Sequence, residues 1–203
     1  GNVVLAGLTL SSDGISGVTP IGMGKTSNTM GENDAFVAKL SSTGVRQWGT
    51  YYGGTGATVF EGFNSVAVDA EGHVLLAGYT QSTLSSLAFN GYQSANGGGY
   101  DYLIVKLNLA GVRLWATFYG GASADNFAHV GSDAAGNAYV IGNSISYCAY
   151  TGTGLQLVKF DASGAPQYAN CLDLPGAMNG SDIAVDSAGH MLLSYYTAVP
   201  GLA

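Results

Sequence analysis

Charged residues, and basic residues above all, are scarce in this chain. Asp, Glu, Lys and Arg make up 9% of its 203 residues, and only six residues are Lys or Arg. A surface that binds nucleic acid needs clustered basic side chains to contact the phosphates. Because the six basic residues are scattered and the formal net charge is -7, we expect no nucleic-acid partner.

Helix-forming residues and long apolar runs are lacking as well. Glu occurs three times and Lys four times, whereas 32 residues are Gly and Val, Tyr, Thr and Ser are plentiful. This composition favours strands and turns, and a hydrophobic content of 47% is enough for a packed core. No run of 18 apolar residues exists, so we predict no membrane span. Neither an initiator Met nor a signal peptide opens the sequence, and we expect a piece of a longer protein.

The chain does contain an internal repeat. A Gly followed by Asn or His opens copies at Gly1, Gly72 and Gly136, and Gly189 opens an unfinished copy. Recurrence of this kind indicates one supersecondary unit that is used several times. Each full copy holds four short apolar or alternating segments, which we predict to be strands.

Short turn motifs join these strands in pairs. Asp69-Ala-Glu-Gly72 and Asn108-Leu-Ala-Gly111 are examples, and a polar residue that opens a turn closed by Gly is typical of a hairpin. The remaining connections are long: 10–33, 81–100 and 145–153 after the second strand of a copy, and 53–62, 120–126 and 173–180 after the fourth. Antiparallel order then places the tight turns at one end of each sheet and the long loops at the other. Loops held by a rigid frame commonly form binding sites.

The sequence therefore predicts an all-β protein, and specifically a β-propeller built of four-stranded antiparallel blades. We expect three strands of one blade in 1–52, complete blades in 64–119 and 127–172, and two strands of another in 181–197. About three blades are too few for an ordinary closed ring. We therefore expect part of a larger ring, or a unit whose half-blades another chain completes.

Several motifs resemble the bacterial SBBP β-propeller repeat family. They are Gly31-Glu-Asn-Asp34-Ala-Phe-Val-Ala-Lys39-Leu40, Trp48-Gly-Thr-Tyr-Tyr-Gly-Gly54, Ser65-Val-Ala-Val-Asp69 and the segment 91–107. The resemblance covers nearly the whole chain, but the third copy departs from it: Gly154 stands where Asp34 and Asp101 stand, and Tyr168 replaces Trp. The resemblance implies a propeller module of a secreted or surface-attached bacterial protein, and it implies no common catalytic site.

Neither a nucleotide site nor a catalytic site is predicted. Gly22-Met-Gly24-Lys25-Thr26 looks like a phosphate loop, but the Walker pattern requires Gly where this chain has Thr19, and no helix is expected to follow. No Ser-His-Asp set or carboxylate pair recurs, so we expect that the protein is not an enzyme.

Metal binding has little support from the sequence. His73 and His190 occupy the turn position of Asn2 and Asn137, and His129 stands apart, so no zinc site is expected. Four acidic residues are expected at the loop end of the strands: Asp34, Glu61, Asp101 and Asp125. Such loops could hold Ca²⁺, although we favour loops that are simply capped and solvated. No other cofactor is expected.

Five of the six basic residues recur at equivalent positions of the predicted strands. These residues are Lys39, Lys106, Lys159, Arg46 and Arg113, and we expect them to cover apolar surface and meet turn carboxylates.

Cys148 and Cys171 both lie at the loop end of one blade. A disulfide between them is plausible, but one strand separates them and two buried thiols remain the alternative.

The candidate binding residues lie at the loop end: Glu61, Tyr79, Tyr92, Tyr100, Asp101 and Asp125. Exposed tyrosine rings can stack on sugars or anchor protein partners, and they can equally pack at the rim. The leading hypothesis is a non-catalytic extracellular or cell-surface scaffold that presents loops for protein recognition or adhesion. The alternatives are a carbohydrate-binding module, or a structural protein that self-associates through open blade edges.

Overall fold

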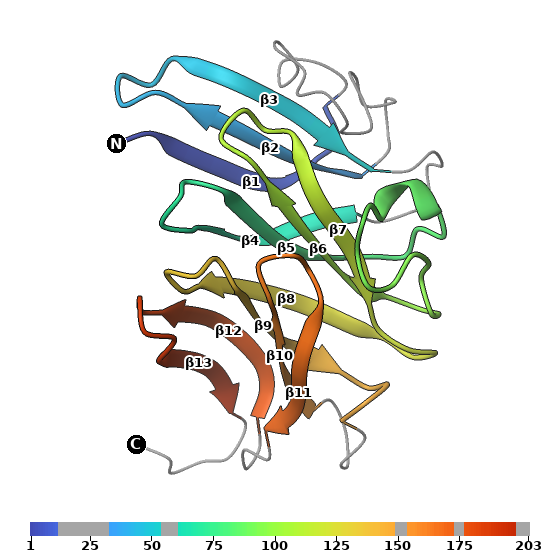
Figure 1. Ribbon diagram of the computed structural model, residues 1–203. Coiled ribbons are helices and arrows are strands. Elements are labelled where there is room, and N and C mark those ends of the chain that lie inside the picture. Colours follow the sequence, from blue (N-terminus) through green and yellow to red (C-terminus); the bar gives the residue numbers. More distant parts are fainter. Residues whose placement is uncertain (12–32, 54–60, 149–153, 173–176, 198–203) are drawn as a thin grey trace.

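The computed structural model describes residues 1–11, 33–53, 61–148, 154–172 and 177–197, and these residues form four antiparallel sheets (Figure 1). Sheet 1 contains β1 (Val3–Thr9), β2 (Asp34–Leu40) and β3 (Arg46–Tyr52). Sheet 2 contains β4 (Glu61–Val68), β5 (Val74–Thr80), β6 (Asp101–Leu107) and β7 (Arg113–Tyr119). Sheet 3 contains β8 (Asp125–Ser132), β9 (Ala138–Ser144), β10 (Gly154–Phe160) and β11 (Pro166–Leu172). Sheet 4 contains β12 (Ala177–Val185) and β13 (Met191–Thr197).

The strands of every sheet follow one another in sequence order, which confirms the predicted all-β chain with four-stranded antiparallel sheets. The one helical segment of the described residues is a short 3₁₀ turn at Ser85–Leu87. None of the described residues belongs to a helix that is long and apolar enough to cross a membrane. The predicted connections 10–33 and 53–62 fall largely outside the described residues, as does 173–176. Residues 177–180, which were predicted to belong to a connection, are part of β12.

Strand register places the tight turns at one end of each sheet. In sheet 2, Val74 pairs with Leu107, so the β4–β5 and β6–β7 turns leave from the same end, which we call the turn end. Thr80 pairs with Asp101 at the opposite end, from which the long connections leave, and we call this the loop end. The predicted separation of short turns and long loops is therefore present in the sheet.

The turns form as their sequences predict. Gly72 has a φ of 81° and its backbone N–H donates a 3.0 Å hydrogen bond to the carbonyl of Asp69. The Asp69 side chain accepts the backbone N–H groups of Glu71 and His73 through Oδ1. Because an L-residue with a side chain rarely adopts such a φ, Gly closes each turn at little conformational cost.

Consecutive sheets pack face to face and share three hydrophobic clusters. Along β5, Val74 and Leu76 belong to the cluster shared with sheet 1, whereas Leu75 and Ala77 belong to the cluster shared with sheet 3. Successive residues of a strand point to opposite faces, so a strand buried on both faces is apolar throughout. This explains why residues 74–79 of β5 and 102–105 of β6 are apolar without polar alternation.

The first strands of the sheets lie closest to one another. β4 neighbours β8, and β8 neighbours β12, whereas the fourth strands β7 and β11 have no comparable contact with each other in the described ranges. The sheets are therefore closer together along their first strands than along their last strands (Figure 1).

Candidate functional site

The predicted acidic residues gather at the loop end, but their side chains are buried. Glu61 begins β4 and Asp101 begins β6, and both pair with Thr80 of β5 in the strand register. Asp125 begins β8 in the next sheet, and its backbone N–H donates a 2.6 Å hydrogen bond to the carbonyl of Tyr100. All three acidic residues are at most 1% exposed, so none of them lies on the surface as a free ligand.

Asp101 and Asp125 organise the backbone of the loops around them. Asp101 Oδ2 accepts the backbone N–H of Gly97 at 2.8 Å and the side-chain amide of Gln93 at 2.9 Å. Asp125 Oδ2 accepts the backbone N–H of Gly121 at 2.9 Å and the hydroxyl of Ser146 at 2.6 Å. These bonds tie the 81–100 connection to β6, and they tie residues of the β7–β8 and β9–β10 connections to the start of β8.

Gly120 lies between the two carboxylates. A Cβ at this position would be 2.8 Å from Asp125 Oδ2 and closer still to Asp101 Oδ1. Gly53 has the same relationship to Asp34 in sheet 1. The Gly after the last Tyr of β7 is therefore required by the Asp that begins β6, and the Gly after the last Tyr of β3 is required by the Asp that begins β2. Sheet 3 has Gly154 in place of that Asp and no Gly after β11, which fits this dependence.

The environment of Asp101 disfavours its ionised form. Burial raises the pKa of the carboxyl to about 6; the hydrogen bond from Gly97 opposes this shift and the charge of Asp125 adds to it. Asp101 Oδ1 has no hydrogen-bond partner among the described residues. A protonated Asp101 would relieve both conditions, because it removes one charge and turns an acceptor into a donor.

A cluster of tyrosines lies beside this network, and we call Tyr92, Tyr119 and Tyr147 the tyrosine cluster. Tyr119 is mostly buried, and its ring centre lies 6.4 Å from that of Tyr92 and 5.8 Å from that of Tyr147. Tyr92 is 64% exposed and Tyr147 is 49% exposed. The Tyr147 hydroxyl donates a 2.9 Å hydrogen bond to the carbonyl of Gly120, so its ring has a fixed position.

Of the three tyrosines that the sequence singled out, only Tyr92 is well exposed. Tyr79 and Tyr100 are half-buried and pack edge to face with ring centres 5.4 Å apart, which matches the alternative in which these rings pack against each other. Tyr147 was not predicted as a binding residue. Its place next to Cys148, after β9 at the loop end, was the signal available in the sequence.

Cys148 and Cys171 are joined by a disulfide with an S–S distance of 2.09 Å. The bridge links the residue after Tyr147 to β11, and the first residue of β10 lies beside it. That residue is Gly154, at which a Cβ would lie 2.5 Å from both the Cβ and the carbonyl oxygen of Cys148. The missing side chain at Gly154 therefore makes room for Cys148 next to the strand that separates the two cysteines.

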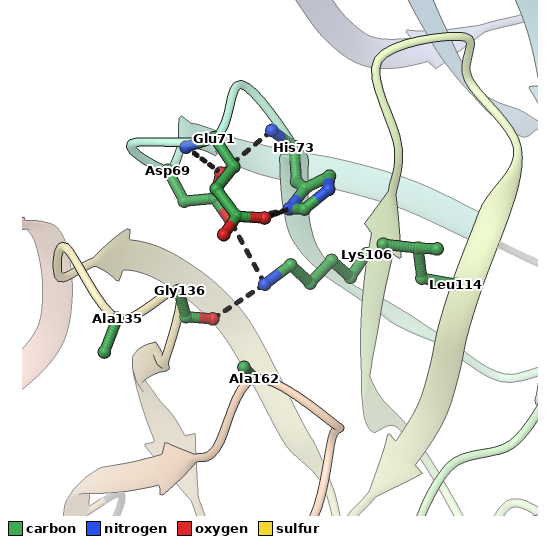
Figure 2. A pocket seen from close by; sticks show the side chains of 8 residues that line it. All are labelled: Asp69, Glu71, His73, Lys106, Leu114, Ala135, Gly136 and Ala162. Carbon is green, nitrogen blue, oxygen red and sulfur yellow. Dashed lines mark hydrogen bonds and ion pairs between the residues drawn. The ribbon is translucent and has the colours of Figure 1, made fainter.

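A small hollow lies at the turn end between sheets 2 and 3 (Figure 2). Lys106 Nζ lies 3.0 Å from Asp69 Oδ2 and donates a 2.8 Å hydrogen bond to the carbonyl of Gly136. His73 Nδ1 lies 3.0 Å from the same Asp69 oxygen. Burial opposes ionisation of Asp69, but hydrogen bonds from Lys106 and His73 outweigh it and lower the pKa of Asp69 overall.

The hollow is a joint between sheets rather than a ligand pocket. Its volume is about 130 Å³, whereas ligand pockets commonly measure 300 Å³ or more. The charges that line it are paired with each other, and Lys106 connects its own sheet to the β8–β9 turn of the next sheet. The expected contact of a strand lysine with a turn carboxylate is thus present for Lys106.

The ranges that the structure describes contain no group of three or more His, Cys, Asp or Glu side chains that could hold a metal ion. The Gly22–Thr26 segment that resembles a phosphate loop lies outside the described residues.

No family model matches the chain, and no curated protein matches it either.

Proposed function

We propose that this protein is a non-catalytic recognition module that binds a partner at the loop end, through the tyrosine cluster. The observation that carries this proposal is the exposure of Tyr92 and Tyr147, whose rings both lie near the buried ring of Tyr119. Tyrosine supplies a large contact area and a hydroxyl at a low cost in side-chain entropy, and it is enriched among the residues that dominate binding energies.

The connections that carry Tyr92 and Tyr147 favour binding because they are held in place without a bound partner. The connection that carries Tyr92 pairs with the edge of β7: Phe89 and Ala116 exchange two backbone hydrogen bonds, and Phe118 donates a third to Gln93. The disulfide and the hydrogen bonds of Asp125 hold the connection that carries Tyr147. Loops that are already ordered lose less conformational entropy on binding.

We further infer that the sheets are successive blades of a β-propeller of the kind to which the SBBP resemblance points. Two features support this inference. Each inner sheet packs on one neighbour through each of its two faces, and the sheets converge at their first strands, as blades do at a central axis. A disulfide agrees with an exported bacterial protein, because such bonds persist in oxidising compartments.

A glycan is the second candidate partner, and the spacing of the tyrosine rings favours it. Sugar rings present apolar faces that pack on aromatic side chains, and two exposed rings that both lie near a third could contact neighbouring sugar units. A protein partner remains the first candidate, because Tyr is a common anchor of protein interfaces and this surface has little charge. Ca²⁺ at the acidic loop end stays a prediction, because the four carboxyl groups there are buried. Among the described residues, Asp101 and Asp125 are the two whose carboxyl groups both lie next to Gly120.

The test compares binding by the wild-type chain and by a Tyr92→Ala, Tyr147→Ala double variant on glycan arrays and on arrays of purified surface proteins. We expect the double variant to lose about tenfold or more of the affinity for any partner found. Tyr168→Ala serves as the matched control, because Tyr168 is a partly exposed tyrosine of β11 near the turn end. Equal binding by the double variant, or equal loss in the control, would reject the tyrosine cluster as the binding surface.

A further inference from the structure

The loop end of sheets 2 and 3 carries two buried carboxyl groups, of Asp101 and Asp125, and no Lys or Arg of the described residues lies near them. The basic residues of the described ranges all adjoin the tight turns at the opposite end of the sheets. Each is the last but one residue of a third strand or the first residue of a fourth strand: Lys39, Lys106, Lys159, Arg46 and Arg113. The described part of this loop end is therefore negative overall.

Asp101 keeps an unused acceptor at this end. Its Oδ1 is buried without a hydrogen-bond partner among the described residues, and it lies against Gly120. A Cβ on Gly120 would also be 2.8 Å from Asp125 Oδ2, and the Gly120 carbonyl accepts the hydroxyl of Tyr147 at 2.9 Å. Gly120 thus connects both carboxylates to the tyrosine cluster.

The rings of the tyrosine cluster are accessible and feel this negative charge. Tyr92 and Tyr147 each lie near the ring of Tyr119, and no ring contact joins the two exposed rings to each other in the described part of the chain. Burial raises the pKa of Tyr147, and the charges of Asp125 and Asp101 raise it further. Aromatic faces attract cations, and nearby carboxylates add to that attraction. The cluster therefore favours a positively charged ligand.

The chain places its own cations on aromatic rings elsewhere. The guanidinium carbon of Arg113 lies 4.8 Å from the ring centre of Phe89, in the connection that also carries Tyr92. Lys159 Nζ lies at the same distance of 4.8 Å from the ring centre of Tyr139. The tyrosine cluster has the rings of such an arrangement, but no Lys or Arg of the described residues fills it.

We propose that the tyrosine cluster binds the guanidinium group of an arginine side chain on a protein partner. This inference rests on the proposed function, because it assigns the chemistry of the partner at the same surface. Guanidinium is more weakly hydrated than ammonium and stacks on aromatic faces, so it loses less hydration when it lies on tyrosine rings. A neutral sugar would gain nothing from the buried carboxylates, which favours a protein partner over a glycan.

The test compares two peptides by NMR titration of the isotope-labelled chain at pH 7.5. The first is acetyl-Ala-Arg-Ala-amide, and in the second citrulline replaces arginine. Citrulline has nearly the shape of arginine but carries no charge. We expect the arginine peptide to bind about tenfold more tightly than the citrulline peptide. A third peptide, with lysine in place of arginine, should bind more weakly than the arginine peptide, because ammonium is more strongly hydrated.

Two variants separate the ring from the charge. Tyr92→Leu keeps an apolar side chain but removes the ring, so it should weaken binding of the arginine peptide by about threefold or more and change citrulline binding little. Asp101 has a pKa of about 6 and is ionised at pH 7.5, so Asp101→Asn removes one buried charge and should weaken binding of the arginine peptide alone. Tyr168→Ala is the matched control and should bind like the wild type. Circular dichroism establishes that each variant is folded.

Equal affinities of the arginine and citrulline peptides, or no measurable binding of either, overturn the inference. Tighter binding of the lysine peptide than of the arginine peptide overturns it too, as does an arginine preference that Tyr92→Leu and Asp101→Asn leave unchanged. The proposed function is judged separately on the arrays. If arrayed partners require Tyr92 and Tyr147 but the arginine peptide has no advantage, the proposed function stands and this inference fails. If the Tyr92→Ala, Tyr147→Ala double variant binds both the arrayed partners and the arginine peptide as the wild type does, both fail.

Discussion

Trp115 of sheet 2 donates a 3.0 Å hydrogen bond from its indole Nε1 to the backbone carbonyl of Ala162 in the β10–β11 turn of sheet 3. Trp48 of sheet 1 makes the equivalent bond of 3.2 Å to Leu109 in the β6–β7 turn of sheet 2. In both cases an aromatic residue of the outer strand reaches the second residue of the corresponding turn in the next sheet. The bond is therefore a repeated element that fixes the position of one sheet on the next.

Trp115→Phe tests this element. The variant keeps an aromatic ring in the cluster but removes the donor, so the Ala162 carbonyl loses its partner. We expect the free energy of unfolding to fall by about 1 to 3 kcal/mol, from the lost hydrogen bond and from the smaller ring. Urea denaturation measures the change. Trp48→Phe should cost less, because the Leu109 carbonyl still accepts a 3.1 Å hydrogen bond from Lys39 Nζ. No loss in either variant would show that the hydrogen bond contributes nothing to stability.

Gly120→Ala should be among the most damaging single substitutions in the described residues. The added methyl group would collide with the carboxylates of Asp101 and Asp125, and the strand pairing leaves the backbone little room to move. We expect a loss of about 3 kcal/mol or more in the free energy of unfolding. The double variant Gly120→Ala, Asp101→Ala should recover part of that loss, because it removes one of the two colliding groups.

Gly44→Ala is the control for this substitution. A Cβ at Gly44 would meet nothing within 4 Å, but the φ of Gly44 is 80°, so the variant carries conformational strain alone. We expect it to cost about 1 kcal/mol. If Gly120→Ala cost no more than Gly44→Ala in the same urea titration, the crowding between the carboxylates would not matter for stability.

Asp101 should give the stability of the protein a defined pH dependence. Its pKa is about 6 in the folded protein and about 3.9 in an unfolded chain, so the folded state holds this proton more tightly. The contribution of Asp101 to the free energy of unfolding therefore falls as pH rises from about 4 to about 6 and stays level above that. Asp101→Asn keeps an acceptor oxygen but cannot ionise.

The difference in unfolding free energy between Asp101→Asn and the wild type isolates this effect from the other titrating groups. We expect the variant to gain on the wild type between pH 4 and pH 6 and to keep that advantage at pH 7.5. A difference that does not change with pH would mean that Asp101 has the same pKa in the folded and the unfolded protein.

The disulfide should stabilise both the fold and the position of Tyr147. Cys148→Ser combined with Cys171→Ser should lower the free energy of unfolding by about 2 to 4 kcal/mol, with a matching fall in the melting temperature. A reductant should produce the same change in the wild type and none in the variant. Equal melting temperatures for the reduced and oxidised wild-type protein would contradict this expectation.

The strands were predictable because their signals are local. The Asp, Asn or Ser that opens each turn and the Gly that closes it, as in Asp69 to Gly72, act within four residues and need no tertiary context. The apolar character of β5 on both faces also follows from the sequence, because only a strand covered on both sides can be apolar throughout.

The loop end was less predictable because its side chains depend on segments far apart in the chain. The sequence placed Asp101 and Asp125 at the correct end of the strands, but their burial depends on Gly120 and on the 81–100 connection, which folds onto β7 without a local pattern. Whether the disulfide forms was open because β10 lies between the cysteines. Gly154 leaves room for Cys148 beside β10, and this role follows from the three-dimensional structure and not from a local sequence pattern.

Because each inner sheet is covered by one neighbour on either side, the chain has no single centre on which all its stability depends. A protein stabilised in this way should yield stepwise under a pulling force, with one sheet detaching while those beyond it keep their contacts. The same property lets evolution lengthen or shorten such a chain by whole sheets without redesigning the rest.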